Sequence, residues 1–310
     1  MAMGSTLTLV AWTDDETGAR AAFDAVYREF DRLDGLLSVW KPASDVSRIN
    51  DNAGVGSVPV SPETLEIVET ATDISDRTQG TFDITFGALA DVWKFDHDQD
   101  GSVPTADQIA ARLPLVNYRA VVRQELRRTV FLQKKGMRMH LGGIGKGYAV
   151  DRGVGMLREH GLRDFMVQAG GDLYVAGSKG DQPWTLGIAD PRNADGAPFA
   201  TVQLRDKTLS TSGDYERSFM KDGVRYHHIL DVRTGQPARL SRSVTLVSSK
   251  AVLADALAKG VFILGPAEGM ALIERLPDVD GVIVTADNQV LVSSGLKALV
   301  TITHPPTEGP

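Results

Sequence analysis

The sequence predicts an α+β fold with mixed or antiparallel sheets and packed helices. Short runs of alternating apolar and polar residues recur along the chain, and the helical stripes between them do not follow the regular alternation of a parallel α/β protein. The 310 residues are 42% hydrophobic and 24% charged, which suits a globular chain that can bury a core without disulfides. Because no repeat or linker divides the chain, we predict one domain over residues 1–303, with a cleft between two lobes as an option, and a flexible tail over residues 304–310.

The first part of the chain predicts one strand and three helices. The apolar run over residues 6–12 alternates like a strand. Residues 13–16 fit a capping box, and the helix that follows has one apolar face, formed by Phe23, Val26, Phe30, Leu33 and Leu37. Ser61 caps a second helix that Gly80 stops, and Thr105 caps a short third one.

The remainder predicts mainly strands. Residues 120–140 contain short strands separated by charged turns, and a glycine-rich loop then opens a helix that ends near Gly161. Residues 251–264 and 266–276 form two further helices. The expected strands are residues 165–169, 174–176, 184–188, 201–204, 243–247, 281–285 and 290–292.

Charge and cysteine content exclude several classes of function. A formal net charge of −7 provides no global positive field for a nucleic acid, so an anionic ligand needs locally placed cations, amides or a metal. The absence of cysteine excludes disulfides, thiolate nucleophiles and cysteine zinc sites. No apolar run approaches the roughly 18 residues that span a bilayer.

The glycine-rich loop over residues 142–147 is a candidate anion site. Its spacing matches neither a P-loop nor a Rossmann fingerprint. Glycines still allow the backbone to approach a ligand, the following helix has a positive N-terminus, and Lys146 adds a full charge. The alternative is an ordinary strand-to-helix turn with a solvated lysine.

Two further positions could carry chemistry. His227 and His228 are adjacent, so on a strand they face opposite sides and one of them can enter a site as a base or a phosphate ligand. Asp255 is the acid of an apolar helix, where a carboxylate needs a metal or another partner. Lys259, four residues later, offers the simpler alternative of a local ion pair.

Residues 96–107 partly match a calcium-binding loop. Asp96, Asp98 and Asp100 have the required spacing, and a glycine follows them. Asp107 stands where a longer glutamate is expected, and Pro104 is unfavourable inside the loop. A solvated acidic turn is the alternative reading of this segment.

Eight short segments occur in a specific order along the chain. They are residues 2–5, 37–50, 80–85, 142–147, 169–172, 211–215, 228–235 and 254–258. Each is weak alone, but together they resemble the ApbE family, the FAD:protein FMN transferases. The resemblance runs from Met3 to about Leu264 and implies an ApbE-like α+β architecture related to the T-fold.

The resemblance implies roles for particular residues. Lys146 corresponds to a position near the pyrophosphate of FAD, and His228 to a histidine at the phosphates. Asp255 and the carbonyl oxygen of Gly143 correspond to ligands of a magnesium ion. The positions that correspond to the lining of the FAD pocket are Met3, Trp40, Thr81, Phe82 and Asp83.

Two residues depart from the family pattern. His140 stands where an aspartate commonly precedes Leu-Gly-Gly, next to the expected flavin site. Lys259 replaces the threonine that commonly follows the metal-binding aspartate by four residues. Since a protonated lysine cannot ligate magnesium, either the ion keeps fewer protein ligands or the ammonium group occupies its place.

The resemblance implies a magnesium-dependent transferase that attaches FMN to a threonine or serine of an acceptor protein and releases AMP. FAD hydrolysis to FMN and AMP is one alternative, and a non-catalytic FAD-binding protein is another, because of Lys259. A calcium-binding module is the third. The family also implies an acceptor in an electron-transfer complex, and the net charge leads us to expect no nucleic acid as a partner. We expect a periplasmic or envelope location with a leader or lipid anchor absent from this chain, although a cytoplasmic one stays open.

Overall fold

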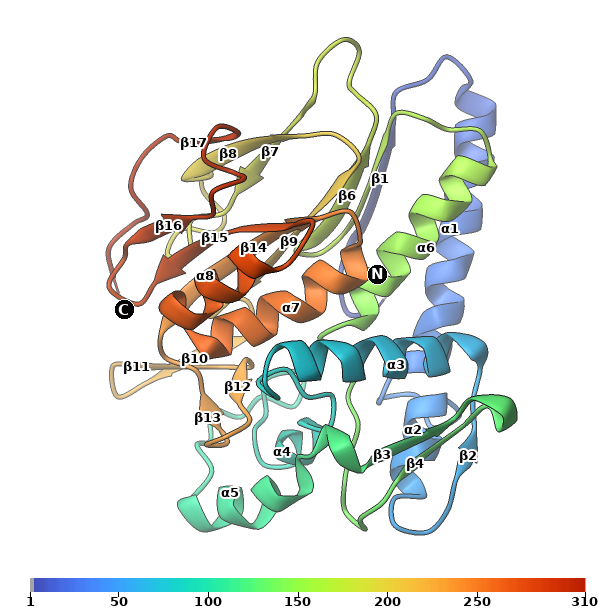
Figure 1. Ribbon diagram of the computed structural model, residues 1–310, viewed down its shortest axis with the longest axis vertical. Helices are drawn as coiled ribbons and strands as arrows, with labels where there is room; N and C mark the ends of the chain where they lie inside the picture. The colour runs from blue at the N-terminus through green and yellow to red at the C-terminus, as the bar shows by residue number, and fades with distance from the viewer. Residues whose placement is uncertain (1–2, 310) are drawn as a thin grey trace.

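The centre of the molecule is a seven-stranded antiparallel sheet in the order β1-β5-β6-β9-β14-β15-β16 (Figure 1). The computed structural model describes residues 3–309, so Ala2, part of the first segment of the resemblance, lies outside the described residues. The strands of this sheet are β1 (Leu7–Ala11), β5 (Phe165–Ala169), β6 (Asp172–Ala176), β9 (Lys207–Gly213), β14 (Ser241–Ser248), β15 (Val279–Thr285) and β16 (Val290–Val292).

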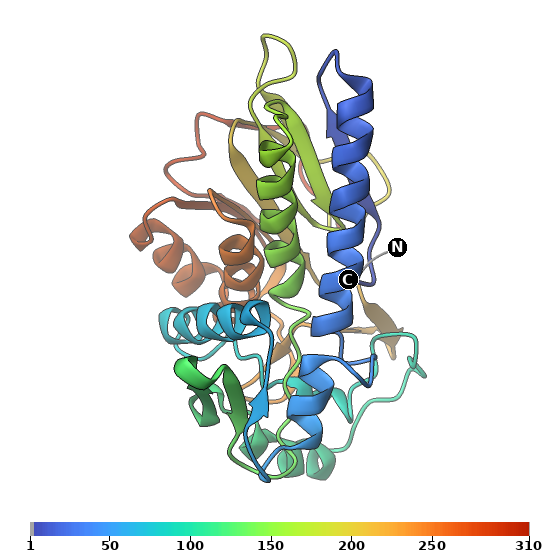
Figure 2. The same ribbon diagram turned by 90° about the vertical axis from the view of Figure 1, so that its right-hand side faces the viewer.

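Helices cover one face of this sheet (Figures 1 and 2). They are α1 (Glu16–Leu37), α6 (Gly145–Glu159), α7 (Ala251–Leu264) and α8 (Pro266–Arg275). Strand β14 is buried along its whole length, because its alternate side chains enter two different cores. Leu246 joins the core under the helices, whereas Val247 joins the core on the opposite face.

The opposite face packs against a smaller sheet in the order β17-β8-β7. Its strands are β7 (Trp184–Ile188), β8 (Ala200–Leu204) and β17 (Val300–Ile302). Trp184 and Phe199 fill the space between the two sheets. This part of the molecule therefore has three layers: helices, the large sheet and the small sheet.

A second lobe, mainly from residues 38–140, lies below the large sheet in Figure 1. Its helices are α2 (Asp45–Asp51), α3 (Pro62–Arg77), α4 (Gly87–Ala90) and α5 (Ala106–Arg112), with 3-10 turns at Leu113–Leu115, Tyr118–Ala120 and Glu125–Arg127. Its sheet contains β2 (Val58–Pro59), β3 (Val121–Gln124) and β4 (Thr129–Leu132). Two small ladders pair β10 (Ser218–Lys221) with β11 (Val224–His227), and β12 (Leu230–Asp231) with β13 (Gln236–Pro237).

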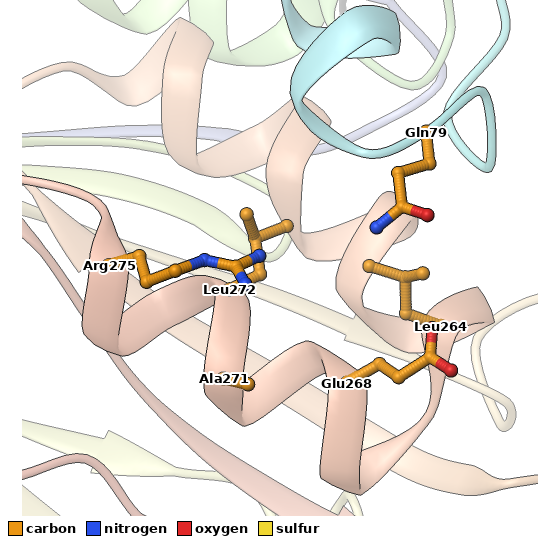
Figure 3. A pocket seen from close by; sticks show the side chains of 6 residues that line it. All are labelled: Gln79, Leu264, Glu268, Ala271, Leu272 and Arg275. Carbon is orange, nitrogen blue, oxygen red and sulfur yellow. The ribbon is translucent and has the colours of Figure 1, made fainter.

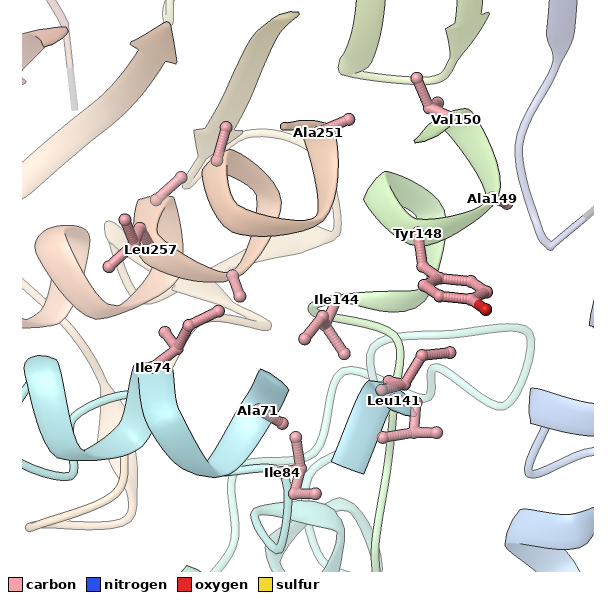
Figure 4. Close-up of a cluster of buried hydrophobic side chains, with 14 of the residues drawn as sticks. Ala71, Ile74, Ile84, Leu141, Ile144, Tyr148, Ala149, Val150, Ala251 and Leu257 are labelled. Carbon is pink, nitrogen blue, oxygen red and sulfur yellow. The ribbon is translucent and has the colours of Figure 1, made fainter. Parts of the chain in front are cut away.

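The two lobes share one apolar core. Figure 4 shows Ile74 of α3 and Leu257 of α7 in the same buried cluster as Leu141 and Ile144, the apolar residues on either side of Gly142 and Gly143. Leu141 and Ile144 are almost completely buried. The glycine loop is therefore anchored by hydrophobic burial on both sides of these two glycines, at the junction of the lobes.

Most predicted elements are confirmed, including the caps at Ser61 and Thr105. The start of α1 differs from the prediction. Its N-cap is Asp15, whose carboxylate accepts a hydrogen bond from the Gly18 N–H (2.9 Å), so the capping box over residues 13–16 was wrong by two residues. Several residues near this start can cap a helix, and the tertiary position of the helix selects among them.

The C-terminal segment, predicted to be a flexible tail, makes specific contacts. The backbone N–H and the side chain of Thr307 both donate to Asp190, at 2.9 and 2.7 Å. Asn288 donates to the Pro306 carbonyl oxygen (2.7 Å), and Pro306 is buried.

None of the helices within residues 3–309 combines the length and the apolar character needed to cross a membrane.

Candidate active site at the junction of helices α6 and α7

Charged residues from three elements meet at the N-terminal end of α6. Lys146, the second residue of this helix, forms an ion pair with Asp172 at the start of β6. Ser210 of β9 donates its hydroxyl to the other carboxylate oxygen of Asp172. Burial by itself would lower the pKa of Lys146, but the carboxylates of Asp172 and Asp255 outweigh burial and raise it. Lys146 is thus a fixed cation at the positive end of a helix.

Asp172 is fully buried, and three neighbours stabilise its charge. Burial acts to raise the pKa of Asp172, yet the ammonium groups of Lys146 and Lys259 and the Ser210 hydroxyl hold it below its usual range. The sequence indicated Asp172 as part of a motif without a role. The sequence feature that could have indicated a site role for Asp172 is its place directly after two glycines, at the start of an apolar strand.

Asp255 lies on α7 and faces the same cluster. One of its carboxylate oxygens pairs with the ammonium group of Lys259, and the other accepts a hydrogen bond from the Gly147 N–H (2.8 Å). The Lys259 side chain passes close to Gly143, because a Cβ atom on that glycine would lie 3.9 Å from the lysine Cδ. The structure therefore brings together Lys146, Asp255, Lys259 and the glycine loop.

The two adjacent histidines have different surroundings, as the strand argument predicted. His227 is buried: its Nε2 contacts the Ala238 carbonyl oxygen (2.7 Å) and its Nδ1 accepts from the Ile229 N–H (3.3 Å). His228 is partly exposed, and its Nδ1 has no hydrogen-bond partner among the described residues. Burial, followed by nearby cations, keeps the pKa of His228 well below its usual value, so the ring is a neutral base at pH 7.

Arg217 is a site residue that the sequence did not indicate. It forms an ion pair with Asp96, and its charge contributes to the lowered pKa values of His140 and His228. A Cβ atom on Gly4 would lie 3.2 Å from the Arg217 guanidinium, which places this cation beside the N-terminal segment. No motif contains Arg217, because the fold of the chain is what brings it to the site.

Three of the expected pocket residues lie around this cluster. Met3 contacts the start of α6, since a Cβ atom on Gly145 would lie 3.3 Å from the Met3 methyl group. Trp40 is 55% exposed and makes an edge-to-face contact with the His97 ring, with 4.5 Å between the ring centres. Burial lowers the pKa of His140 to about 4, and its neutral Nδ1 accepts from the Gly142 N–H (3.0 Å).

The other three expected pocket residues are buried supports of the loops. Thr81 donates to the carbonyl oxygen of Gly260 on α7 (3.1 Å). Phe82 packs 3.4 Å from a Cβ position on Gly143. Asp83 accepts from the Thr85 side chain (2.6 Å) and the Tyr118 N–H (2.8 Å). The side-chain polar atoms of Thr81 and Asp83 are therefore used inside the protein, and Phe82 is the one of the three that lies against the glycine loop.

The residues present do not fit a family-type magnesium site. Both oxygens of Asp255 already have protein partners, and Lys259 stands at the position of the expected second side-chain ligand. Among residues 3–309 no group of three or more His, Asp or Glu side chains could hold a metal. In the calcium-loop alternative, two of the acids are engaged in ion pairs, Asp96 with Arg217 and Asp100 with Lys94.

The surface also contains a hollow of about 250 Å³ beside α8 (Figure 3). It is lined by Gln79, Leu264, Glu268, Ala271, Leu272 and Arg275. It shares no residue with the charged cluster, and its glutamate and arginine carry opposite charges. The candidate active site is therefore defined by its charged groups and not by this hollow.

Comparison with known proteins shows the family to which the chain is related. A family model described as the ApbE family matches residues 3–283. The chain belongs to the ApbE family. A relative from Treponema pallidum (strain Nichols), named FAD:protein FMN transferase, is 33% identical, and the match covers 89% of this chain and 80% of the relative. A relative of the same name from Klebsiella pneumoniae (strain 342) is also 33% identical, with 94% and 90% covered.

Solved ApbE structures have the same fold. The ApbE protein from Thermotoga maritima superposes with a TM-score of 0.89 at 32% identity, and the match covers 96% of this chain and 97% of that one. The flavin transferase ApbE from Vibrio cholerae gives a TM-score of 0.85 at 27% identity with the same coverage. The predicted α+β class is confirmed, and the protein is a transferase of the ApbE family.

Proposed function

We propose that this enzyme is an FAD:protein FMN transferase that links FMN through a phosphoester bond to a threonine or serine of an acceptor protein and releases AMP. One observation carries the proposal. A neutral histidine, His228, has an unpaired Nδ1 within electrostatic reach of three cations, Lys146, Lys259 and Arg217. A base beside concentrated positive charge is what attack on a pyrophosphate requires.

The residues have separate tasks in the proposed reaction. The acceptor hydroxyl oxygen bonds to the FMN phosphorus while the bond from that phosphorus to the bridging oxygen breaks, so AMP leaves with the electron pair. His228 accepts the hydroxyl proton, since its ring is neutral at pH 7. The cations and the N-terminus of α6 neutralise the charge that develops on the phosphate oxygens. No step is assigned to magnesium, because the donors around Asp255 are engaged.

The resemblance also suggests the partner and the location. Because the family resemblance implies an acceptor in an electron-transfer complex, we propose an electron-transfer subunit as the acceptor. We propose a location outside the cytoplasmic membrane on the same basis. Fractionation of cells that express the full-length gene tests the location independently of the chemistry.

Mass spectrometry tests the reaction. The protein is mixed with FAD, magnesium and a peptide that carries an Asp-x-x-Ser-Gly-Ala-Thr-like segment, and the peptide is weighed. We expect a gain equal to one FMN, with AMP released. His228→Ala should slow the transfer by about 10²- to 10⁴-fold, whereas His160→Ala, at an exposed position after α6, should not.

Two other outcomes would replace the proposal. An unchanged peptide with FAD split into FMN and AMP would assign hydrolysis, in which water takes the place of the acceptor hydroxyl. An unchanged peptide with bound, intact FAD would assign a binding protein. The Lys259–Asp255 pair favours this second alternative over hydrolysis, because a single ammonium charge neutralises less phosphate charge than a divalent ion.

A further inference from the structure

The pairing of Lys259 with Asp255 is unlike an ordinary helix ion pair. Residues four apart on a helix often pair on the solvent side, where the pair contributes little. Here the side chain of Asp255 is fully buried and that of Lys259 is 16% exposed. A buried carboxylate without a partner is strongly destabilising, so Lys259 stabilises the charge of Asp255 inside the protein.

The Lys259 charge also acts on the second buried acid of the cluster. It is one of the two cations that hold the pKa of Asp172 down against the effect of burial. The ammonium group is therefore within electrostatic reach of both acids, and its stem passes the glycine loop at Gly143. Asp255 and the Gly143 carbonyl oxygen are the groups that would hold a divalent ion in the family pattern, and the ammonium group would compete with that ion for Asp255.

A metal and this ammonium group exclude each other at the site. A protonated lysine has no lone pair to offer a metal, and two positive charges a few ångströms apart repel. The Asp255 oxygen that pairs with Lys259 would have to give up that contact to ligate a metal, while its other oxygen accepts from the Gly147 N–H at 2.8 Å. The site therefore contains either the ammonium group or the metal.

We infer that Lys259 is the resident cation of this active site and takes the place of a divalent metal. This inference rests on the proposed function: in it, Lys146, Lys259 and Arg217 bind the pyrophosphate of FAD without a metal ion. Each of these cations is already paired with a carboxylate, namely Asp172, Asp255 and Asp96. FAD binding then needs no free metal and persists in a chelator.

The first test uses Mn²⁺ alone, so it does not depend on FAD or on turnover. Electron paramagnetic resonance is used to titrate free Mn²⁺ against the apo-protein. The wild type should show no Mn²⁺ site that depends on Asp255. Lys259→Thr should gain one such site, which Lys259→Thr/Asp255→Asn loses again. A wild-type Mn²⁺ site that Asp255→Asn abolishes, or a Lys259→Thr protein that folds and gains no site, would overturn the inference.

The second test measures FAD affinity in EDTA by quenching of flavin fluorescence. Lys259→Met keeps the length of the side chain and removes its charge, and we expect Kd to rise by about 10- to 100-fold. Lys207→Met is the matched control, because Lys207 pairs with Asp278 at the surface. Unchanged affinity in Lys259→Met, or wild-type affinity that collapses in EDTA, would contradict the inference. If the wild type binds no FAD under any condition, the proposed function fails, and the Mn²⁺ result still decides the place of the metal.

Discussion

At the scale of single residues, the site depends on charges held inside the protein by specific partners. Lys146 is the clearest case, because it is anchored by a fully buried acid, Asp172, that is itself bound by Ser210. Because the pair already holds the lysine side chain in place, a ligand does not have to order that side chain when it binds. The same arrangement makes each partner costly to remove separately.

Lys146→Met should lower the free energy of unfolding by about 3–5 kcal/mol, because it leaves Asp172 buried without its countercharge. Lys146→Met/Asp172→Asn should recover most of this loss, since neither charge then remains. Urea unfolding of the two variants is the measurement. Lys207→Met, which breaks a surface pair, should cost less than about 1 kcal/mol. A double variant as unstable as the single one would contradict a charge-based explanation.

The histidines predict how stability depends on pH. Burial lowers the pKa of both His140 and His227 to about 4, whereas an unfolded histidine titrates near 6.5. Between these values the unfolded chain binds more protons than the folded one, so stability must fall as pH decreases from about 6.5 to 4. Each histidine contributes up to about 1.4 kcal/mol per pH unit.

Urea denaturation at a series of pH values between 4 and 7 measures this slope. We expect His140→Asn to keep the fold and to have a shallower slope than the wild type in this window. His160→Asn, at an exposed position, serves as the control and should leave the slope unchanged. Equal slopes in all three proteins would show that His140 is not held neutral by the fold.

At the scale of elements, the contact between α6 and α7 determines the geometry of the site. Gly147 lies inside α6, where glycine is normally unfavourable. A Cβ atom there would lie 2.3 Å from the Ala251 carbonyl oxygen and 2.7 Å from the Asp255 Cβ. The glycine therefore allows the two helices to touch, and this contact gives Asp255 its hydrogen bond from the Gly147 N–H.

Gly147→Ala should separate the helices, lower stability by more than about 2 kcal/mol through steric overlap, and weaken FAD binding. Gly155→Ala is a matched control on the same helix, because a Cβ atom at Gly155 meets no atom within 4 Å. That control should gain up to about 1 kcal/mol from helix propensity. Thermal melts together with FAD titration distinguish the two, and equal behaviour of both variants would contradict the role of close packing.

At the scale of the whole molecule, the two lobes share one hydrophobic core. The same cluster contains Ile67 of α3 and Leu132 of β4 from one lobe, and Val244 of β14 and Leu257 of α7 from the other. The glycine loop crosses this shared core, with Ile144 buried in it (Figure 4). The position of the loop therefore depends on both lobes being folded.

We expect a single cooperative unfolding transition, because neither lobe keeps a complete core when the other unfolds. Differential scanning calorimetry measures this, with circular dichroism and flavin release recorded over the same range of temperature. Coincident transitions are the expected result. Two resolved transitions, with flavin lost in the first, would show that the lobes fold as separate domains.

The sequence by itself determined much of the architecture and the family. Local signals are sufficient to predict an element where a helix has its own cap and apolar face, as at Ser61, or where a strand alternates over five residues, as in residues 165–169. It also indicated Lys146, His228 and Asp255 as candidates, because glycine-flanked lysines, adjacent histidines and acids in apolar helices are unusual in a chain of this composition.

The tertiary structure alone decided which of these groups meet and what each one contacts. Arg217 belongs to no sequence motif and is brought to the site by the fold, where it pairs with Asp96. Asp83, which its motif predicts for the flavin pocket, is buried and accepts hydrogen bonds from Thr85 and Tyr118. Both outcomes depend on contacts between residues far apart in the sequence. The choice between a metal and an ammonium group at Asp255 depends on burial, because Lys259 would be an ordinary surface pair if α7 were exposed. Spacing along a chain gives the neighbours on one helix, whereas burial and charge balance come from the elements that pack against it.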